Sequence, residues 1–354
     1  LEANRNINNH QSRIKEGQQE KFCTFNLQGG LDPEANPTGA ATLFEDFRDH
    51  EVEIAALQEV HVKEDRYFGQ QNEEDPDQNG IIYAIAGRNA NKAKRYGQGF
   101  FISAKWRKHY LSHEYISDRI SAIHFNLNTK IENRDVKMTI INVYAPHTGY
   151  LDQSPEVIPT FYELLTQTYA RYNTGNNALV IVMGDFNSKL GQKTRGETTN
   201  IVGSYGKGKR NRTGNLMAEF MEENNLLATN TIFRKSIFKR ITWTKCLQGK
   251  IVYNQIDYIL LEQQKRHLCE DSQAHRTFLY ESDHFPVITT LNLTELYREL
   301  PRGKKTGACA NLEYNKLTTW AGKAYKYGGR AEGFTYEFQD KVEIKLAAII
   351  TENK

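Results

Sequence analysis

The stretch Val180–Asn187 of this 354-residue chain has the sequence Val-Ile-Val-Met-Gly-Asp-Phe-Asn. Its four leading apolar residues are typical of a strand buried on both faces. Asp185 and Asn187 follow at a spacing of two, so an extended backbone places both side chains on one face. A carboxylate there can align or deprotonate a water molecule, and the amide can hold a phosphate oxygen. In isolation such a pair is more often a turn or a helix cap.

Similar β-prone runs recur on both sides of this stretch, each bounded by Gly, Asn, Asp or Pro. Together they exceed what one sheet comfortably holds, so two packed sheets are expected. The runs cover 22–27, 54–60, 81–86, 99–103, 120–127, 136–144, 179–183, 241–244, 255–261 and 287–293. Helical periodicity over 42–50, 158–172 and 216–227 makes the predicted fold class α/β with mixed sheets.

The two ends of the chain differ from its middle in composition. Residues 1–20 are polar and lack apolar periodicity, which predicts a disordered lead-in before one large domain over 21–293. The segment 294–354 begins with a basic linker and ends in an amphipathic stretch over 334–350 that we expect to be helical. No run of about 20 apolar residues and no signal-peptide pattern is present, so neither membrane association nor secretion is expected.

Basic residues gather in clusters although the net charge is only +3. These clusters lie beside Gly, Asn or aromatic residues, which suits contacts with a phosphate backbone. For any one of them, an ordinary solvated face is the more common explanation. The clusters are Lys92–Arg95, Lys105–His109 and Lys207–Arg212. The four cysteines are widely spaced and form no Cys-x-x-Cys pair, so neither a zinc knuckle nor a dense disulfide framework is indicated.

An acid stands beside an imidazole at Asp283-His284, just before the run 287–293. Histidine is the natural proton-transfer group near neutral pH, and it needs a carboxylate to fix its tautomer. Asp257, which interrupts an otherwise apolar run, is a candidate for that orienting role. The alternative for Asp257 is a structural ion pair with a nearby Arg.

Three further strand ends carry polar residues. Asn26 and Glu59 are hard oxygen donors, and Mg²⁺ is usually held by one or two carboxylates together with waters and substrate phosphates. Glu59 with Asn26 and Asp283 is therefore a sufficient metal set. The Tyr144 hydroxyl can donate to a phosphoryl oxygen, although a core or surface tyrosine is the alternative. Polar residues converging at strand ends are how α/β proteins build sites, and chance explains six such ends poorly.

Taken in order, these motifs resemble the endonuclease/exonuclease/phosphatase family. The resemblance covers about Phe22–Leu293 and implies a four-layer α/β sandwich, with two mixed β-sheets packed face to face and helices outside. Within the family, residues 211–220, 223–226, 229–233, 241–243 and 254–260 resemble the apurinic-type endonuclease domain of LINE-type, RTE-like retrotransposons. The motifs are Asn26, Gln58-Glu59, Tyr144-Ala145-Pro146, Gly184–Asn187, Asp257-Tyr258 and Ser282-Asp283-His284.

The resemblance implies catalytic roles for five residues. Tyr144 would stabilise charge on the phosphoryl group, and Asp185 with Asn187 would position water or the leaving oxygen. His284 would transfer a proton or stabilise the phosphate, and Asp257 would hold it. General-base and electrostatic roles use the same residue types, so the division of labour stays open.

The resemblance also implies a cofactor, a substrate and a setting. Glu59, Asn26 and Asp283 would bind Mg²⁺, with Mn²⁺ as an alternative, and Thr242 and Ser282 would contact substrate phosphate. The expected activity is nicking of DNA in the nucleus, as in target-primed retrotransposition. The segment 294–354 would lead toward a reverse transcriptase domain as partner.

Departures from the pattern and rival functions stay open at this point. Gln28-Gly29-Gly30 replaces an Arg- or Thr-containing loop, and His61 follows the Gln58-Glu59 pair where such elements more often carry a Thr and an Arg. Lys245-Cys246-Leu247 replaces a Ser-Pro-Asp-like turn. One rival is a phosphatase or lipid phosphodiesterase of the same superfamily, whose members usually have His in place of Tyr144. The other is a catalytically inactive nucleic-acid-binding module.

Overall fold

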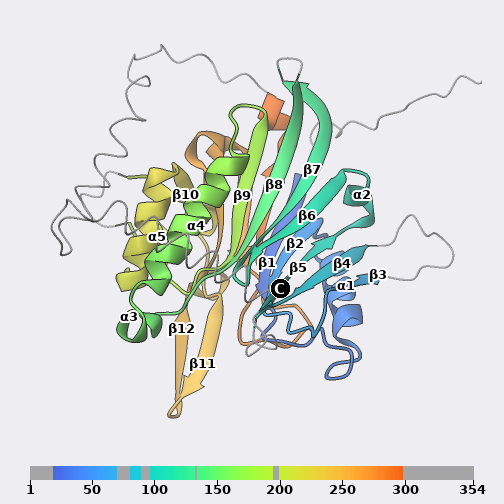
Figure 1. The fold of residues 1–354 in the computed structure, drawn as a ribbon. Coiled ribbons are helices and arrows are strands. Elements are labelled where there is room, and N and C mark those ends of the chain that lie inside the picture. Colours follow the sequence, from blue (N-terminus) through green and yellow to red (C-terminus); the bar gives the residue numbers. More distant parts are fainter. Residues whose placement is uncertain (1–18, 70–79, 89–95, 132–133, 194–198, 298–354) are drawn as a thin grey trace, which may run out of the picture. The chain divides into compact units, whose positions relative to one another are not determined.

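The computed structural model describes residues 19–69, 80–88, 96–131, 134–193 and 199–297. Within these ranges the chain forms a seven-stranded sheet, a six-stranded sheet and a two-stranded ribbon (Figure 1). The predicted lead-in up to residue 18, and the predicted linker and helix beyond Tyr297, lie outside the described residues and stay predictions. None of the described helices is both long and apolar enough to cross a membrane.

The seven-stranded sheet has the order β14-β15-β1-β2-β5-β4-β3. It is mixed, because β1 and β2 run parallel while the other neighbours run antiparallel. Its strands are β1 (Gln19–Asn26), β2 (Ile54–Gln58), β3 (Arg66–Gly69), β4 (Ile81–Ala86), β5 (Gly97–Ile102), β14 (Cys269–Ala274) and β15 (Val287–Asn292).

The six-stranded sheet has the order β10-β13-β9-β8-β7-β6. It is also mixed, since β8 and β9 run parallel and the remaining pairs are antiparallel. Its strands are β6 (Tyr110–Ser117), β7 (Ile120–Ile131), β8 (Arg134–Tyr144), β9 (Ala178–Asp185), β10 (Leu226–Ala228) and β13 (Asp257–Glu262). The ribbon consists of β11 (Trp243–Leu247) and β12 (Lys250–Asn254), and it projects from the body (Figure 1).

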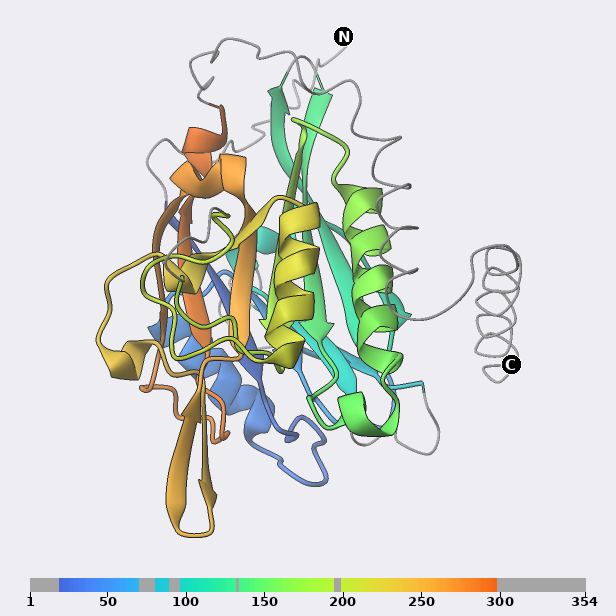
Figure 2. The same cartoon turned by 90° about the vertical axis from the view of Figure 1, so that its left-hand side faces the viewer.

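Helices cover the outer faces of both sheets. Figure 2 shows α4 (Val157–Tyr172) and α5 (Arg212–Glu223) on the outside of the six-stranded sheet. Helix α1 (Gly39–Asp49) lies on the other sheet, and α2 (Ala104–Arg107) and α3 (Tyr150–Gln153) are single turns. Short 3-10 helices cover Thr229–Thr231, Ile237–Lys239, Gln263–Leu268 and Leu293–Tyr297.

Three buried apolar clusters separate the four layers, which confirms the predicted sandwich. The central cluster joins inward-facing residues of both sheets, including Phe22, Ile54 and Ile181. A second cluster packs α4 and α5 on the six-stranded sheet, and a third packs α1 on the seven-stranded sheet. Because burial of apolar area is the dominant favourable term in folding, these clusters fix the relative position of the two sheets.

The predicted elements differ from the observed ones mainly at their ends. All ten predicted strands form, but β1 starts at Gln19 and so includes two residues that the sequence assigns to the lead-in. Glu20 is fully buried there, bonded to Lys105 and Trp106. The predicted helix 216–227 is wrong at its end, because α5 stops at Glu223 and Leu226 begins β10. The turn at Asn225, where φ is 55°, separates the two elements.

Candidate active site

Strand register places the predicted residues of each sheet in a row. In the six-stranded sheet, Asp185 at the end of β9 pairs with Tyr144 at the end of β8 and with Asp257 at the start of β13. In the seven-stranded sheet, Asn26 pairs with Gln58 at the ends of β1 and β2. Asp257 opens its strand instead of ending it, because β13 is antiparallel to β9. The two rows therefore lie at the same edge of the sandwich.

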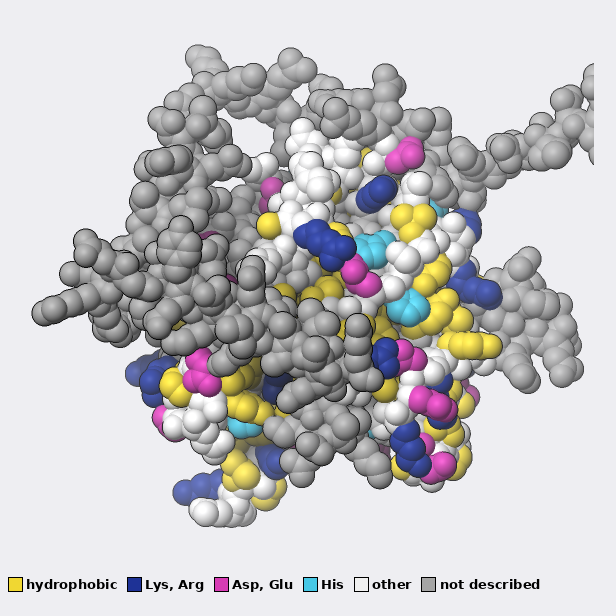
Figure 3. Space-filling view, viewed as in Figure 1, with side chains coloured by type: hydrophobic (Ala, Val, Ile, Leu, Met, Phe, Trp, Pro, Cys, Tyr) yellow, Lys and Arg dark blue, Asp and Glu magenta, His cyan; other side chains and the backbone are white. Residues whose placement is uncertain are grey.

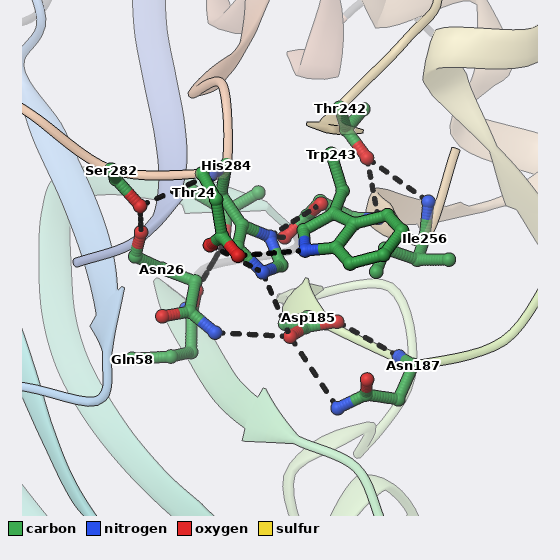
Figure 4. A network of polar contacts seen from close by, with 12 residues as sticks. Thr24, Asn26, Gln58, Asp185, Asn187, Thr242, Trp243, Ile256, Ser282 and His284 are labelled. Carbon is green, nitrogen blue, oxygen red and sulfur yellow. Dashed lines mark hydrogen bonds and ion pairs between the residues drawn. The ribbon is translucent and has the colours of Figure 1, made fainter. Parts of the chain in front are cut away.

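Asn26 joins the two sheets through its side chain. Its amide Nδ2 donates to Asp185 Oδ2 at 3.0 Å (Figure 4). The same nitrogen donates to Glu59 Oε1 at 2.9 Å. Its Oδ1 accepts from the backbone N–H of Gln28 at 2.9 Å. Asn26 is fully buried, and a buried amide without partners would be costly. These bonds fix the position of the Glu59 carboxylate against that of Asp185, although the two residues come from different sheets.

The backbone around the site is held in an unusual conformation. Gln28, Glu59, His61 and Asn187 all have φ near +50°, a region that residues other than Gly adopt uncommonly and that Asn and His tolerate better than Gln and Glu. Strained residues of this kind cost of order 1–3 kcal/mol and concentrate at functional sites. These four residues follow the ends of strands and do not lie inside the sheets, so the backbone strain is located at the site.

Asp185 is buried and held on several sides. The backbone N–H of Asn187 donates to its Oδ1 at 2.8 Å, and the Asn187 side-chain amide lies 3.4 Å from its Oδ2. The same amide donates to the carbonyl of Ala145 at 2.9 Å. Asn187 therefore ties Asp185 to the segment that follows Tyr144.

Asp257 and His284 form a close pair. Nδ1 of His284 lies 3.1 Å from both carboxylate oxygens of Asp257, and Nε2 lies 3.8 Å from Asp185 Oδ2. Both side chains are buried, so the pair is not a surface salt bridge. The hydroxyl of Thr242 accepts from the backbone N–H groups of Ile256 and Asp257 at 3.0 and 3.1 Å, which fixes the start of β13.

The loop before β15 brings Ser282 and Asp283 to the same place. The Ser282 hydroxyl donates to the Asn26 carbonyl at 2.8 Å and accepts from the N–H of His284 at 3.1 Å (Figure 4). Asp283 Oδ2 accepts from the Trp243 indole N–H at 3.1 Å, and its Oδ1 lies 3.8 Å from His284 Nε2. Thr242 and Ser282 thus have positioning contacts, and their contacts with substrate stay predictions, as does metal binding by Asp283.

Tyr144 faces Glu59 and rests against an arginine that the sequence did not single out. Its hydroxyl lies beside the Glu59 carboxylate, and the Arg119 guanidinium lies 5.3 Å from the centroid of its ring. Arg119 also donates to the Tyr144 carbonyl at 3.1 Å and lies over the rings of Tyr96 and Tyr150. Nothing in the sequence indicates that Arg119, in the turn before β7, contacts Tyr144. Only the pairing of β7 with β8 brings the two residues together.

The pKa values of three ionisable groups in the site are shifted from their ordinary values. Burial, with the charge of Asp257, raises the pKa of Asp185 to about 7. Burial lowers the pKa of His284, but the charges of Asp257 and Asp185 outweigh it and raise that pKa to about 9. Burial also raises the pKa of Glu59, yet contacts with His61, Asn26 and Tyr144 lower it overall. At neutral pH the site therefore holds an imidazolium beside carboxylates, a combination typical of catalytic centres.

The donor set fits a hard divalent cation. Glu59 and Asp185 offer carboxylate oxygens, which Mg²⁺ and Mn²⁺ accept, and the Asn26 amide holds these two carboxylates in place. Metal binding by Asn26 stays a prediction, because its amide oxygen accepts from the N–H of Gln28. Nε2 of His61 is buried beside Glu59 without a hydrogen bond of normal geometry, an arrangement that a bound cation would satisfy. Asp185, Asp257 and His284 also have ligand atoms within 4.8 Å of one another. Because Nδ1 of His284 already bonds Asp257, the Glu59 side is the better position.

The structure describes two of the three basic clusters noted in the sequence. Lys92–Arg95 lies outside the described residues. Lys105 pairs with Glu20 and Glu53 at 2.7 and 2.9 Å, so it has a structural role. Lys207 donates to the Tyr253 carbonyl in the ribbon at 2.8 Å. Figure 3 shows Lys and Arg side chains lying beside Asp and Glu on the displayed face, which matches ion pairing more than a single basic patch.

Every residue that the sequence predicted for the site lies at this edge of the sandwich. A two-sheet α/β sandwich whose facing strand ends carry acids, amides and an imidazole defines a class of proteins that includes nucleases and phosphatases. The chain belongs to the Endonuclease/Exonuclease/phosphatase family, whose sequence pattern matches residues 23–284. Nucleases of this family generally depend on a divalent metal.

Individual relatives are more distant. Craniofacial development protein 2 of Bos taurus is 28% identical over 200 residues, which are 56% of this chain and 31% of that protein. The match thus spans about a third of the relative's length. Among solved structures, the AP endonuclease LMAP of Leishmania major has a TM-score of 0.53 at 13% identity, covering 77% of this chain and 88% of that one. The catalytic domain of Xenopus laevis APE2 has a TM-score of 0.50 at 16% identity, covering 77% and 91%. These structures share the fold.

Proposed function

We propose that this chain is a divalent-metal-dependent endonuclease that nicks DNA by phosphodiester hydrolysis. The observation that carries the proposal is the Asn26 amide, which holds Glu59 of one sheet against Asp185 of the other beside the Asp257–His284 pair. A structural ion pair would not need two further carboxylates and strained backbone at the same place. Perturbed pKa values and convergent polar groups favour a reaction centre.

Each residue has a role that its contacts allow. Glu59, with Asn26 beside it, would hold Mg²⁺ or Mn²⁺, and the ion would supply positive charge against a phosphoryl oxygen. Asp185, whose pKa is raised toward neutrality, accepts a proton from the attacking water. His284, positively charged and fixed by Asp257, stabilises the charge that develops on the phosphate. The Tyr144 hydroxyl can donate to a phosphoryl oxygen.

DNA is favoured over a small phosphate ester by two features. The first is Tyr144 itself, since phosphatase and lipid-cleaving branches of the family usually have His there. The second is the ribbon β11–β12, which projects from the body and begins at Trp243, the residue that holds Asp283 (Figure 1). Its exposed Leu247, Ile251 and Tyr253 offer a surface suited to an extended ligand.

The biological setting is part of the same proposal. The resemblance to LINE-type endonuclease domains supports target nicking in the nucleus, with a reverse transcriptase domain as partner. A catalytically inactive DNA-binding module is the second candidate, because the family resemblance concerns fold and motifs and not turnover. It predicts DNA binding without any metal-dependent nicking.

Turnover of three substrate classes tests the proposal. Supercoiled plasmid, inositol phosphates and sphingomyelin are incubated with the protein in Mg²⁺, in Mn²⁺ and with EDTA. We expect metal-dependent nicking of the plasmid and no turnover of the other two. Nicking should disappear in Asp185→Ala and His284→Ala and persist in Asp49→Ala, which changes an exposed acid on α1. Equal nicking by the native protein and the three variants would contradict the assignment of the active site. Turnover of the lipid or inositol substrate alone would instead indicate a phosphatase or lipid phosphodiesterase.

A further inference from the structure

His61 is placed beside the one carboxylate oxygen of Glu59 that Asn26 leaves free. Asn26 donates to Oε1, whereas Nε2 of His61 lies 3.3 Å from Oε2. That nitrogen is buried, and it makes no hydrogen bond of normal geometry. Unpaired buried polar atoms are uncommon in native proteins, and each calls for a specific explanation such as an absent ion.

The backbone holds the imidazole in this position at a cost. His61 and Glu59 both have φ of 52°, so the chain turns twice within three residues. Gly29 lets the ring lie there, because a Cβ on Gly29 would be 2.8 Å from Nδ1 of His61. The N–H of Gly29 in turn donates to the Glu59 carbonyl at 2.7 Å. Three neighbouring features therefore converge on one ring orientation.

The separation of the two donor atoms fits joint coordination of one ion. Ligands at about 2.1 Å in neighbouring positions of an octahedral ion lie about 3.0 Å apart. The observed 3.3 Å between Nε2 of His61 and Oε2 of Glu59 is close to that value.

We propose that His61 supplies an imidazole nitrogen to the divalent cation that Glu59 holds, and that it shifts the metal preference of the site toward first-row transition ions. The inference rests on the proposed metal-dependent function and deepens it. Oxygen donors suit Mg²⁺, whereas imidazole nitrogen adds affinity for transition ions in the Irving–Williams order. A residue that only oriented Glu59 would not touch the ion.

Pulsed electron paramagnetic resonance of bound Mn²⁺ tests the contact directly, because a coordinated imidazole gives ¹⁴N modulation of the spin echo. We expect this modulation in the native protein and its loss in His61→Asn, because Asn tolerates positive φ but has no ring nitrogen. His61→Gln is the second variant, since Gln28 already adopts the same φ. His267→Asn, at an exposed histidine of the 3-10 helix Gln263–Leu268, should retain the modulation.

Calorimetry adds a second readout. We expect His61→Asn to lose at least about tenfold in Co²⁺ affinity, as even loss of an outer-shell partner does, with a smaller change for Mg²⁺. Mn²⁺ bound without ¹⁴N modulation in the native protein, or modulation that persists in both His61 variants, would overturn the inference. The proposed function would still stand in that case if the protein nicks plasmid in a metal-dependent way. Absence of both metal binding and nicking in the native protein would overturn both.

Discussion

Nδ1 of His284 lies 3.1 Å from both carboxylate oxygens of Asp257, and both side chains are buried at the edge where the two sheets meet. The imidazole has one nitrogen engaged in this way, so the other, Nε2, faces Asp185 and Asp283. This arrangement fixes the orientation of the ring. It also keeps the ring positively charged at neutral pH, since Asp257 and Asp185 outweigh the effect of burial on its pKa.

Asp257→Asn should therefore lower the nicking rate by about 10²–10⁴-fold, the range seen when a buried carboxylate that orients a histidine loses its charge. The amide preserves shape, so the fold should survive. Single-turnover nicking of plasmid measures the effect. Asp49→Asn, on the exposed face of α1, serves as the control and should match the native rate. A variant that nicks within twofold of native would show that His284 does not depend on Asp257.

Tyr144→Phe removes the hydroxyl that contacts Glu59 and keeps the ring that Arg119 packs against. We expect a rate loss of about 10²–10³-fold, comparable to removal of one preorganised donor at a charged transition state. The melting temperature should change little. Tyr67→Phe, at an exposed tyrosine of β3, is the matched control. If the Tyr144 variant loses folding and activity together, the tyrosine is structural.

Asp185→Asn should stabilise the metal-free protein as the pH rises. Burial beside Asp257 raises the pKa of Asp185 from 3.8 to about 7, so the folded state binds that proton more tightly than the unfolded state. Ionising the carboxyl then costs stability, a cost absent below pH 4 and complete above pH 7. Because one pKa unit corresponds to about 1.4 kcal/mol, removing this cost should add up to about 4 kcal/mol to the unfolding free energy near pH 8.

Urea unfolding in EDTA at pH 4.5 and pH 8 measures this difference between Asp185→Asn and the native protein. The gain should be small at the lower pH and larger at the higher one. The same variant should no longer nick plasmid in Mg²⁺. A destabilisation that is equal at both pH values would show that ionisation of Asp185 costs no stability and that the residue acts only through its hydrogen bonds.

Gly184→Ala should disrupt the end of β9. Gly184 has φ of 158°, and a Cβ there would lie 1.9 Å from the carbonyl oxygen of Val143 in β8. The strands would have to separate next to Asp185, so we expect a loss of about 3 kcal/mol or more in unfolding free energy. Gly69→Ala, where a Cβ meets nothing within 4 Å, should cost far less. Equal melting temperatures for the two variants would contradict the close strand contact.

Periodicity and residue type in the sequence predicted the strands, the three main helices and the polar residues at strand ends. This works because side-chain alternation and apolar runs are local properties, and buried strands such as β9 leave a strong local pattern. Short or half-exposed strands were missed, including β6 and β10, because their residues carry no clear alternation. The predicted end of α5 was wrong because a single residue, Asn225, specifies the turn that follows the helix.

The sequence by itself determined which residue types stand at the strand ends and therefore which chemistry is available to this protein. Only the tertiary structure decided that Asn26 bridges Glu59 and Asp185 across the two sheets, that Asp257 holds His284, and that His61 faces Glu59. The contacts of Asn26 and of Asp257 join residues 27 to 159 positions apart and depend on strand register. Register follows from packing the whole core, because a slip of one residue would turn every side chain of a strand to the opposite face.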